Sequence, residues 1–160
     1  MRDRRFIAAH RGGPLEREHH HKLAAWAALC AERAVEKFCT DERPRLAIEV
    51  ARMWANGEVK PGVCMKAAVA SHAAARESND LNSISAARAA GHAAATAHAA
   101  DHSLGAALYA AKAAENPESE LDWQIAQTPP ELRVLIVSAI GMKLEAAPGF
   151  LRAKTRKPFT

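Results

Sequence analysis

The sequence is poor in aromatic residues, glycine, proline and cysteine, and each shortage excludes a class of protein. Aromatic residues make up 5% of the 160 residues, and glycine and proline number eight each, which excludes collagen-like, β-rich and low-complexity linker chains. The three cysteines are odd in number and show no C-x-x-C spacing, which argues against a disulfide framework and a structural zinc site. We therefore expect Cys30, Cys39 and Cys64 to be reduced thiols.

Long apolar runs and a basic stripe are also missing. No run approaches the roughly eighteen apolar residues of a membrane span, and the N-terminus lacks the apolar core of a signal peptide, so we expect a cytoplasmic protein with no membrane partner. The excess of Lys and Arg lies in residues 1–22 and 141–160, whereas residues 23–140 carry more acidic than basic side chains. A nucleic-acid-associated helical protein that uses the two basic termini is therefore only a second alternative.

Alanine is the residue that is abundant. The 38 alanines of the 160 residues favour helices, because alanine has the highest intrinsic helix propensity and its methyl group lets helices approach closely. The composition predicts an all-α fold, a single compact bundle of about six to seven helices with an Ala-rich, closely packed centre. We expect a domain over 1–147 with an irregular basic N-terminus (1–14), followed by a loosely held basic C-terminal tail (148–160).

Capping residues, prolines and glycines mark the predicted helix ends. They give helices from Pro14 to about Cys39, from Thr40-Asp41 to Asn56-Gly57, from residue 60 or 61 to Glu77, from residue 82 or 83 to a break at 101–103, and over 104–114, followed by a short helix that opens at Glu115-Asn116-Pro117. The run 132–137 is rich in β-branched residues and could be a strand. A capping box from Thr128 to Glu131 and the lack of a partner strand favour a helix there.

The segment 67–114 is the most unusual part of the chain, since 22 of its 48 residues are alanine. Its polar side chains therefore stand out among methyl groups. A short turn should make the helices that carry His72 and His92 antiparallel neighbours, which brings these two side chains to one seam. Buried polar groups find hydrogen-bond partners, so we expect a structural buried polar seam. Its predicted members are His72, Arg76, His92, His98, Asp101 and His102, with Arg88 as a further polar side chain in the segment.

The histidines also allow a metal interpretation. The stretch His98-x-x-Asp101-His102 resembles the inverted zincin motif H-x-x-E-H, with Asp in place of Glu, and two imidazoles four residues apart on one helix can bind one zinc ion. A small metal-dependent hydrolase that uses His98, Asp101 and His102 is therefore the first alternative. The shorter Asp side chain, the predicted helix break and the missing third ligand argue against it, so we expect no metal, cofactor or catalytic residue. The run 19–21 of three histidines is predicted to lie on a solvated face.

A mixed-charge cluster flanks the start of the predicted second helix. It consists of Glu42, Arg43, Arg45 and Glu49. Either a solvated helix face or the rim of a partner-binding surface accounts for it.

Several stretches, in order along the chain, carry a resemblance to a known family. They cover residues 2–7, 11–13, 26–32, 41–49 (D-E-R-P-R-L-A-I-E), 86–102 (with A-G-H-A-A-A-T-A-H-A-A-D-H) and 109–113. Over about 1–140, the chain resembles the immunity proteins of bacterial polymorphic toxin systems, in the all-helical group called immunity-protein-five-like. The stretches 41–49 and 90–102 are the most specific, because alanine-rich surroundings occur in many helices.

The resemblance implies a function by binding. Such proteins bind and neutralise a toxin made by the same cell or its kin, so the expected partner is a cognate toxin protein and the expected function involves no turnover. The resemblance assigns no catalytic residue. We expect Glu42, Arg43, Arg45 and Glu49 to contribute to the partner-binding surface, because exposed charges set the specificity of protein contacts.

Overall fold

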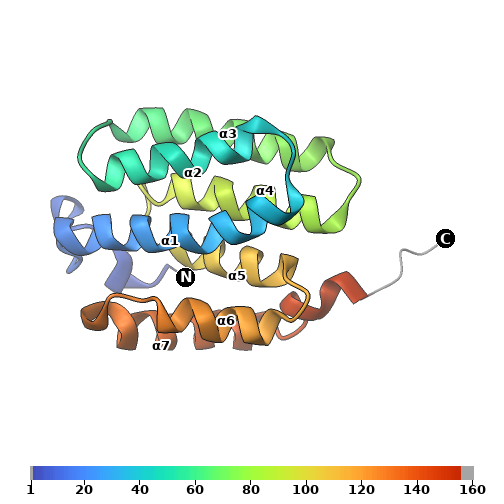
Figure 1. Cartoon of the computed structure of the whole chain (residues 1–160). Coiled ribbons are helices and arrows are strands. Elements are labelled where there is room, and N and C mark those ends of the chain that lie inside the picture. The colour runs from blue at the N-terminus through green and yellow to red at the C-terminus, as the bar shows by residue number, and fades with distance from the viewer. Residues whose placement is uncertain (1, 156–160) are drawn as a thin grey trace.

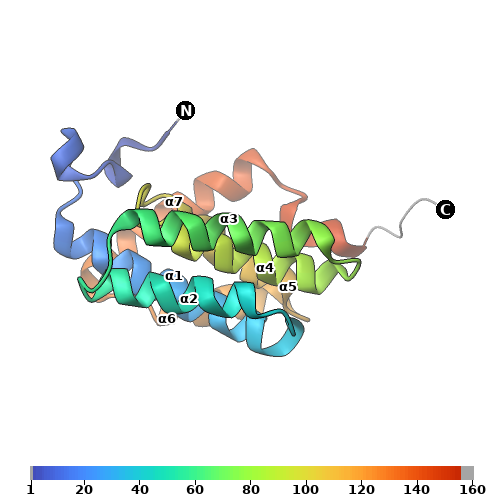
Figure 2. The same ribbon diagram turned by 90° about the horizontal axis from the view of Figure 1, so that it is seen from above.

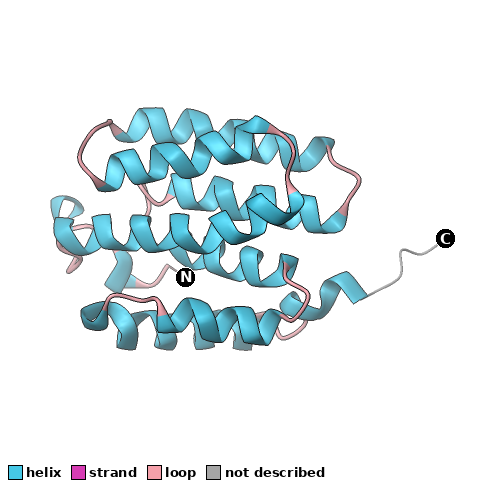
Figure 3. Ribbon diagram, viewed as in Figure 1, coloured by secondary structure: helices cyan, strands magenta, loops and turns pink. Residues whose placement is uncertain are grey.

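Seven α-helices and four short 3₁₀ helices make up residues 2–155, which the computed structural model describes (Figures 1 and 3). Their bounds are α1 (Arg17–Phe38), α2 (Glu42–Ala55), α3 (Pro61–Glu77), α4 (Leu81–Ala95), α5 (His102–Ala113), α6 (Pro117–Ala126) and α7 (Arg133–Ala146), with η1 (Arg4–Phe6), η2 (Ala9–Arg11), η3 (Pro130–Leu132) and η4 (Phe150–Thr155). The described residues contain no strand, only one isolated bridge between Ala8 and Leu15. The all-α prediction is confirmed.

Side-chain caps begin three of the helices. The carboxylate of Asp41 accepts from the Arg43 amide at 2.8 Å before α2, and that of Asp80 accepts from the Ser83 amide at 2.8 Å before α4. Asn116 caps α6 in the same way. Each cap satisfies a backbone N–H that has no partner within its own helix. The predicted end of α2 is also confirmed, because Gly57 adopts the left-handed φ of 76° that a helix C-terminus favours.

Helix α4 forms the centre of the bundle. It packs against α1, α2, α3 and α5, and the views in Figures 1 and 2 place it among these helices. Nine of its fifteen residues are buried, and they are Ser85, Gly91 and seven alanines. Small side chains let neighbouring backbones approach closely, so the Ala-rich packed centre predicted from composition is confirmed.

Large apolar side chains gather in a second cluster around α5. Leu23 and Trp26 of α1 meet Leu104 of α5 and Ile136 of α7 there. The indole Nε1–H of Trp26 donates to the carbonyl of Gln124 at 2.9 Å, and the buried Gln124 amide donates to the carbonyl of Ala107 at 2.9 Å. These two bonds tie α6 to α1 and α5. The bundle thus has an alanine-rich cluster formed by α1 to α5 and a cluster of bulkier side chains, to which α1, α5 and α7 contribute.

Three predicted helix ends are wrong. Helix α1 begins at Arg17, three residues after Pro14, because Leu15 is held by the bridge to Ala8. Helix α4 ends at Ala95, well before the predicted break at 101–103, and residues 96–101 form a turn. No capping box opens α7, because the hydroxyl of Thr128 donates back to the Ile125 carbonyl at 2.7 Å and η3 precedes the helix.

Both terminal segments make contacts with the bundle. In the N-terminal segment, Phe6 and Leu15 are buried in the second cluster, and Gly12, with φ of 83°, allows the chain to turn between them. In the tail, the ring of Phe150 packs edge-on against Tyr109 at 5.1 Å between centroids, so the beginning of the tail is not loosely held. Residues 156–160 of the tail lie outside the described residues. Within residues 2–155, no helix is long and apolar enough to cross a membrane.

Candidate functional site

Histidine rings from three helices meet in one cluster, as the seam prediction requires of His72 and His92. The ring of His92 on α4 lies 5.3 Å from that of His72 on α3 and 5.1 Å from that of His102 on α5, between centroids. Tyr109 stacks on His92 at 5.3 Å between centroids, with an angle of 14° between the planes. His98 extends the cluster, since its ring lies 5.3 Å from that of His102.

Two helical glycines make room for these rings. A Cβ atom on Gly91 of α4 would lie 2.6 Å from Nε2 of His72, and a Cβ atom on Gly105 of α5 would lie 2.8 Å from Nδ1 of His92. Real Cβ atoms do not approach ring atoms this closely, so an alanine at either position would displace the ring. Each of these histidines therefore lies against the backbone of the next helix.

Hydrogen bonds orient the rings of the cluster. Arg88 donates from Nη1 to Nδ1 of His72 at 2.9 Å, so the neutral His72 ring carries its proton on Nε2. His92 and His102 share a hydrogen bond of 2.9 Å between their Nδ1 atoms, in which one ring donates and the other accepts. A doubly protonated His72 would lose the bond from Arg88, and two doubly protonated rings at His92 and His102 would lose theirs.

Burial keeps these histidines neutral. It lowers the pKa of His72 to about 4 and that of His92 to about 3, and the positive charge of Arg88 lowers both further. Burial also lowers the pKa of His102, whereas the nearby carboxylate of Asp101 opposes that change. The rings of His72, His92 and His102 are therefore neutral and hydrogen-bonded at neutral pH, whereas Nδ1 of His98 is buried and has no hydrogen-bond partner within residues 2–155.

The membership of the seam differs from the prediction at two positions. Arg76 is exposed on α3, so its predicted place in the buried seam is wrong, and Arg88 contacts His72 instead. Asp101 stands at the N-cap position of α5, makes no capping hydrogen bond and pairs with Nε of Arg2 at 3.4 Å. No local signal separates the two arginines, because each lies four residues from a histidine of the seam.

The helix that the metal interpretation requires is interrupted. His98 lies in the turn after α4, and His102 is the first residue of α5, so the two imidazoles are not four residues apart on one helix. Over residues 2–155, no three or more His, Cys, Asp or Glu side chains form a group that could hold a metal ion. The geometry gives the hydrolase alternative no support.

The prediction of a solvated face at residues 19–21 is wrong for His20. Its side chain is buried, its Nε2–H donates to the carbonyl of Thr96 at 2.6 Å, and its ring packs edge-on against Trp54 at 4.7 Å. His21 packs against the same indole at 4.5 Å. Since Thr96 is the first residue after α4, His20 joins α1 to the turn between α4 and α5.

The three cysteines are free thiols, as predicted, and all are buried. Burial raises the pKa of Cys39 to about 11 and that of Cys64 to about 11, and it raises the pKa of Cys30 in the same direction. A thiol with a raised pKa is a poor nucleophile at neutral pH, so these residues serve packing.

The mixed-charge cluster predicted as a partner-binding rim lies on the surface of α2. Glu42, Arg45 and Glu49 are exposed and spaced along one face of the helix. Arg43 lies next to them at the start of α2, donates to Asp41 at 2.7 Å and pairs with Glu77 at the end of α3. The structure therefore gathers three of the four predicted residues on one face and uses the fourth to join α2 to α3.

An exposed leucine and a groove accompany these charges. Leu46, one residue after Arg45, has 50% of its surface exposed. Beside it, a groove of about 320 Å³ runs between α1 and α2, and its lining includes Glu32, Arg45 and Glu49. The sequence prediction did not include Leu46, although its place four residues after Glu42 puts it on the same face.

Comparison with known proteins identifies one family. The family described as Imm-5 like putative immunity protein matches residues 13–131, which include α1 to α6. No curated protein and no solved structure matches the chain.

Proposed function

Since the chain belongs to the Imm-5 like putative immunity protein family, we propose that it binds a cognate bacterial toxin and neutralises it by direct contact. The toxin is one made by the same cell or its kin. Inhibition requires only that the chain cover the functional surface of the toxin. The chain therefore inhibits by binding and catalyses no reaction. A lethal enzyme must be almost entirely occupied, which requires a dissociation constant in the nanomolar range or tighter.

The exposed face of α2 is the observation that best supports a contact surface for the toxin. An apolar side chain, Leu46, stands among Glu42, Arg45 and Glu49, all on the solvent side of the helix. Protein interfaces combine a small apolar centre with a charged rim, in which the rim sets association rate and specificity. We propose that Leu46 supplies the apolar centre of this contact and that Glu42, Arg43, Arg45 and Glu49 form its rim.

Charge reversal tests this surface. Arg43→Glu with Arg45→Glu should slow association with the toxin about tenfold or more, because the attraction between complementary surfaces is replaced by repulsion. Exposed ion pairs such as those of Arg43 contribute little to folding, so the variant should keep its helical circular dichroism. The readouts are survival of cells that produce the toxin and the association rate with the purified toxin domain.

A variant with the same change in charge elsewhere is the matched control. Arg4→Glu with Lys143→Glu reverses two exposed cations on η1 and α7, and it should protect cells as well as the original chain does. Full protection by the folded α2 variant would show that this face is not the contact surface. Failure of the original chain to bind any co-encoded toxin domain would contradict the proposed function itself.

A further inference from the structure

A cleft of about 770 Å³ opens at the end of the bundle where α1 and α3 begin. Its walls come from the N-terminal segment, the start of α1, the loop between α2 and α3, and the turn after α4. Leu15, Trp54 and Ala97 supply apolar surface. This cleft is distinct from the proposed contact face, which lies on the N-terminal half of α2, whereas Trp54 and Gly57 of the cleft stand at that helix's other end.

Unpaired cations surround the cleft. Arg11, Arg17 and Lys60 all line it, and none of them forms an ion pair within residues 2–155. Glu58 is the one carboxylate in its lining. Arg33, by comparison, pairs with Glu120 at 2.8 Å. Three cations against a single carboxylate leave the lining with an excess of positive charge, which produces a local positive potential.

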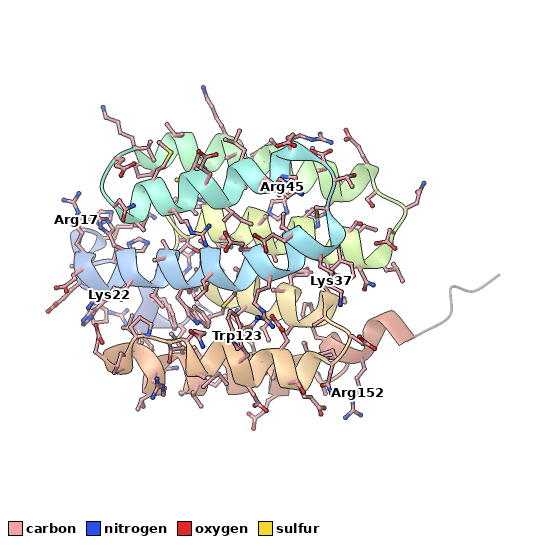
Figure 4. The ribbon with its side chains drawn as sticks, in the orientation of Figure 1. Arg17, Lys22, Lys37, Arg45, Trp123 and Arg152 are labelled. Atoms are coloured by element: carbon pink, nitrogen blue, oxygen red, sulfur yellow. The ribbon has the colours of Figure 1, made fainter. Side chains whose placement is uncertain are left out.

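Two helix N-termini add to this potential. Arg17 and Pro61, the first residues of α1 and α3, both line the cleft, and Figure 4 shows Arg17 at this end of α1. The N-cap positions of these helices, Glu16 and Lys60, provide no side-chain cap, in contrast to the capped starts of α2, α4 and α6. The N-terminus of a helix carries about half a positive charge, and its free N–H groups can donate hydrogen bonds to an anion.

Nearby positive charge also contributes to lowering the pKa of two histidines that line the cleft. Burial lowers the pKa of His21, and the charge of Arg17 lowers it further. Burial likewise lowers the pKa of His98, with Arg11 as the next cause. Both rings line the cleft, so positive charge from two different segments of the chain converges on its interior.

We propose that this cleft binds an acidic segment of a partner polypeptide, with Arg11, Arg17 and Lys60 contacting its carboxylates. The proposal rests on the proposed function, since the partner is the toxin, and it gives the contact a second site on the chain. Apolar side chains next to the acidic residues of the segment would contact Leu15 and Trp54.

The small size of the basic area favours a peptide over a nucleic acid. A phosphate backbone is bound by cations that extend along an element, so that many charges are neutralised at once. Here the three cations surround one cleft, and Glu58 in its lining and the exposed Glu16 and Glu18 near Arg17 limit the positive area. A short acidic segment matches this pattern of charge, whereas a long polyanion would meet the three carboxylates.

A peptide titration tests the cleft without any toxin. The probe is fluorescein-labelled hexaglutamate, and its anisotropy is followed as the full chain is added, with hexaglutamine and the oligonucleotide dT12 as comparison probes. Arg11→Glu, Arg17→Glu and Lys60→Glu combined should weaken hexaglutamate binding at least tenfold. The matched control reverses Lys66, Arg76 and Lys143, three exposed cations outside the cleft, and should change binding less than twofold.

The outcomes separate the possibilities. If hexaglutamate binding weakens equally in the cleft variant and in the control, the proposal is overturned, because the peptide then responds only to net charge. Tighter binding of dT12 than of hexaglutamate would overturn it in favour of nucleic acid. If the triple reversal fails to fold, Arg17→Gln with Lys60→Gln should still weaken binding at least threefold. A failed titration leaves the proposed function standing. If instead the titration succeeds but the original chain does not protect cells, the proposed function is contradicted and the toxin is excluded as the partner of the cleft.

Discussion

Lowering the pH from 7 to 5 should destabilise this protein, and His92 allows the size of the effect to be worked out. Burial, followed by the positive charges that His102, His72, Arg88 and Lys143 can carry, lowers its pKa in the folded chain to about 3. In the unfolded chain the pKa is about 6.5. The folded pKa is the lower one, so the unfolded state binds more protons. The stability is therefore fully present above pH 6.5 and is lost as the pH falls from 6.5 toward 3.

Linkage gives the magnitude for this one side chain. With a pKa of about 6.5 in the unfolded chain and about 3 in the folded chain, this side chain lowers the free energy of unfolding by about 2 kcal/mol when the pH falls from 7 to 5. The pKa values of His72, His102 and His20 are also lowered by burial, so they act in the same direction. A domain is typically stable by only about 5–15 kcal/mol, so the loss is a large part of the total.

Urea unfolding at pH 7 and at pH 5 measures this effect in three proteins. His92→Gln keeps a polar side chain that can hydrogen-bond to His102 and removes the titrating ring, so its loss of stability between the two pH values should be about 2 kcal/mol smaller than that of the original chain. His10→Gln, at an exposed position outside the cluster, should behave as the original chain does. An unchanged pH dependence in His92→Gln would refute the assignment of a neutral, buried ring.

Three further predictions concern packing and metal. Gly91→Ala should lower the free energy of unfolding, measured by thermal unfolding, by about 1–3 kcal/mol, because its Cβ would lie 2.6 Å from Nε2 of His72. Gly141→Ala, whose Cβ would have no atom within 4 Å, should raise the free energy of unfolding by about 0.5–1 kcal/mol. Ala93→Leu in the buried centre should cost about 1–3 kcal/mol, and Ala25→Leu on the exposed side of α1 should stay within about 0.5 kcal/mol. Protein purified without added metal should carry well under one equivalent of zinc and keep its melting temperature in a chelator; stoichiometric zinc that is lost in His98→Ala would instead favour the hydrolase alternative.

The sequence predicts helix ends well where the signal is local. Asp41 and Gly57 bound α2 because a carboxylate cap and a left-handed glycine act within a few residues of the helix they bound. The end of α4 was mispredicted because residues 95–101 contain neither glycine nor proline and are compatible with a helix. The contact that holds the turn comes from His20, 76 residues earlier, which donates to the carbonyl of Thr96. No local pattern carries that information.

The histidine cluster shows the same division between local and distant information. A short connection between α3 and α4 was enough to predict that His72 and His92 meet. The sequence does not predict which arginine contacts His72, because Arg76 lies four residues after His72 and Arg88 lies four residues before His92. By spacing alone the two are equivalent, and only the rotation of α4 against α3 brings Arg88 to His72. The burial of His20 was missed because three consecutive histidines are typical of a solvated surface.

The turn from residue 96 to 101 joins the histidine cluster to the cleft. Ala97 and His98 line the cleft, and the ring of His98 lies 5.3 Å from that of His102 in the cluster. His20 also lines the cleft while it holds Thr96 in place. We therefore expect a substitution of His20 or His98 to disturb the lining of the cleft and the packing of the turn at once. Arg11, Arg17 and Lys60 are exposed and lie outside the histidine cluster, which is why the binding of an acidic segment is to be tested with charge reversals rather than at the histidines.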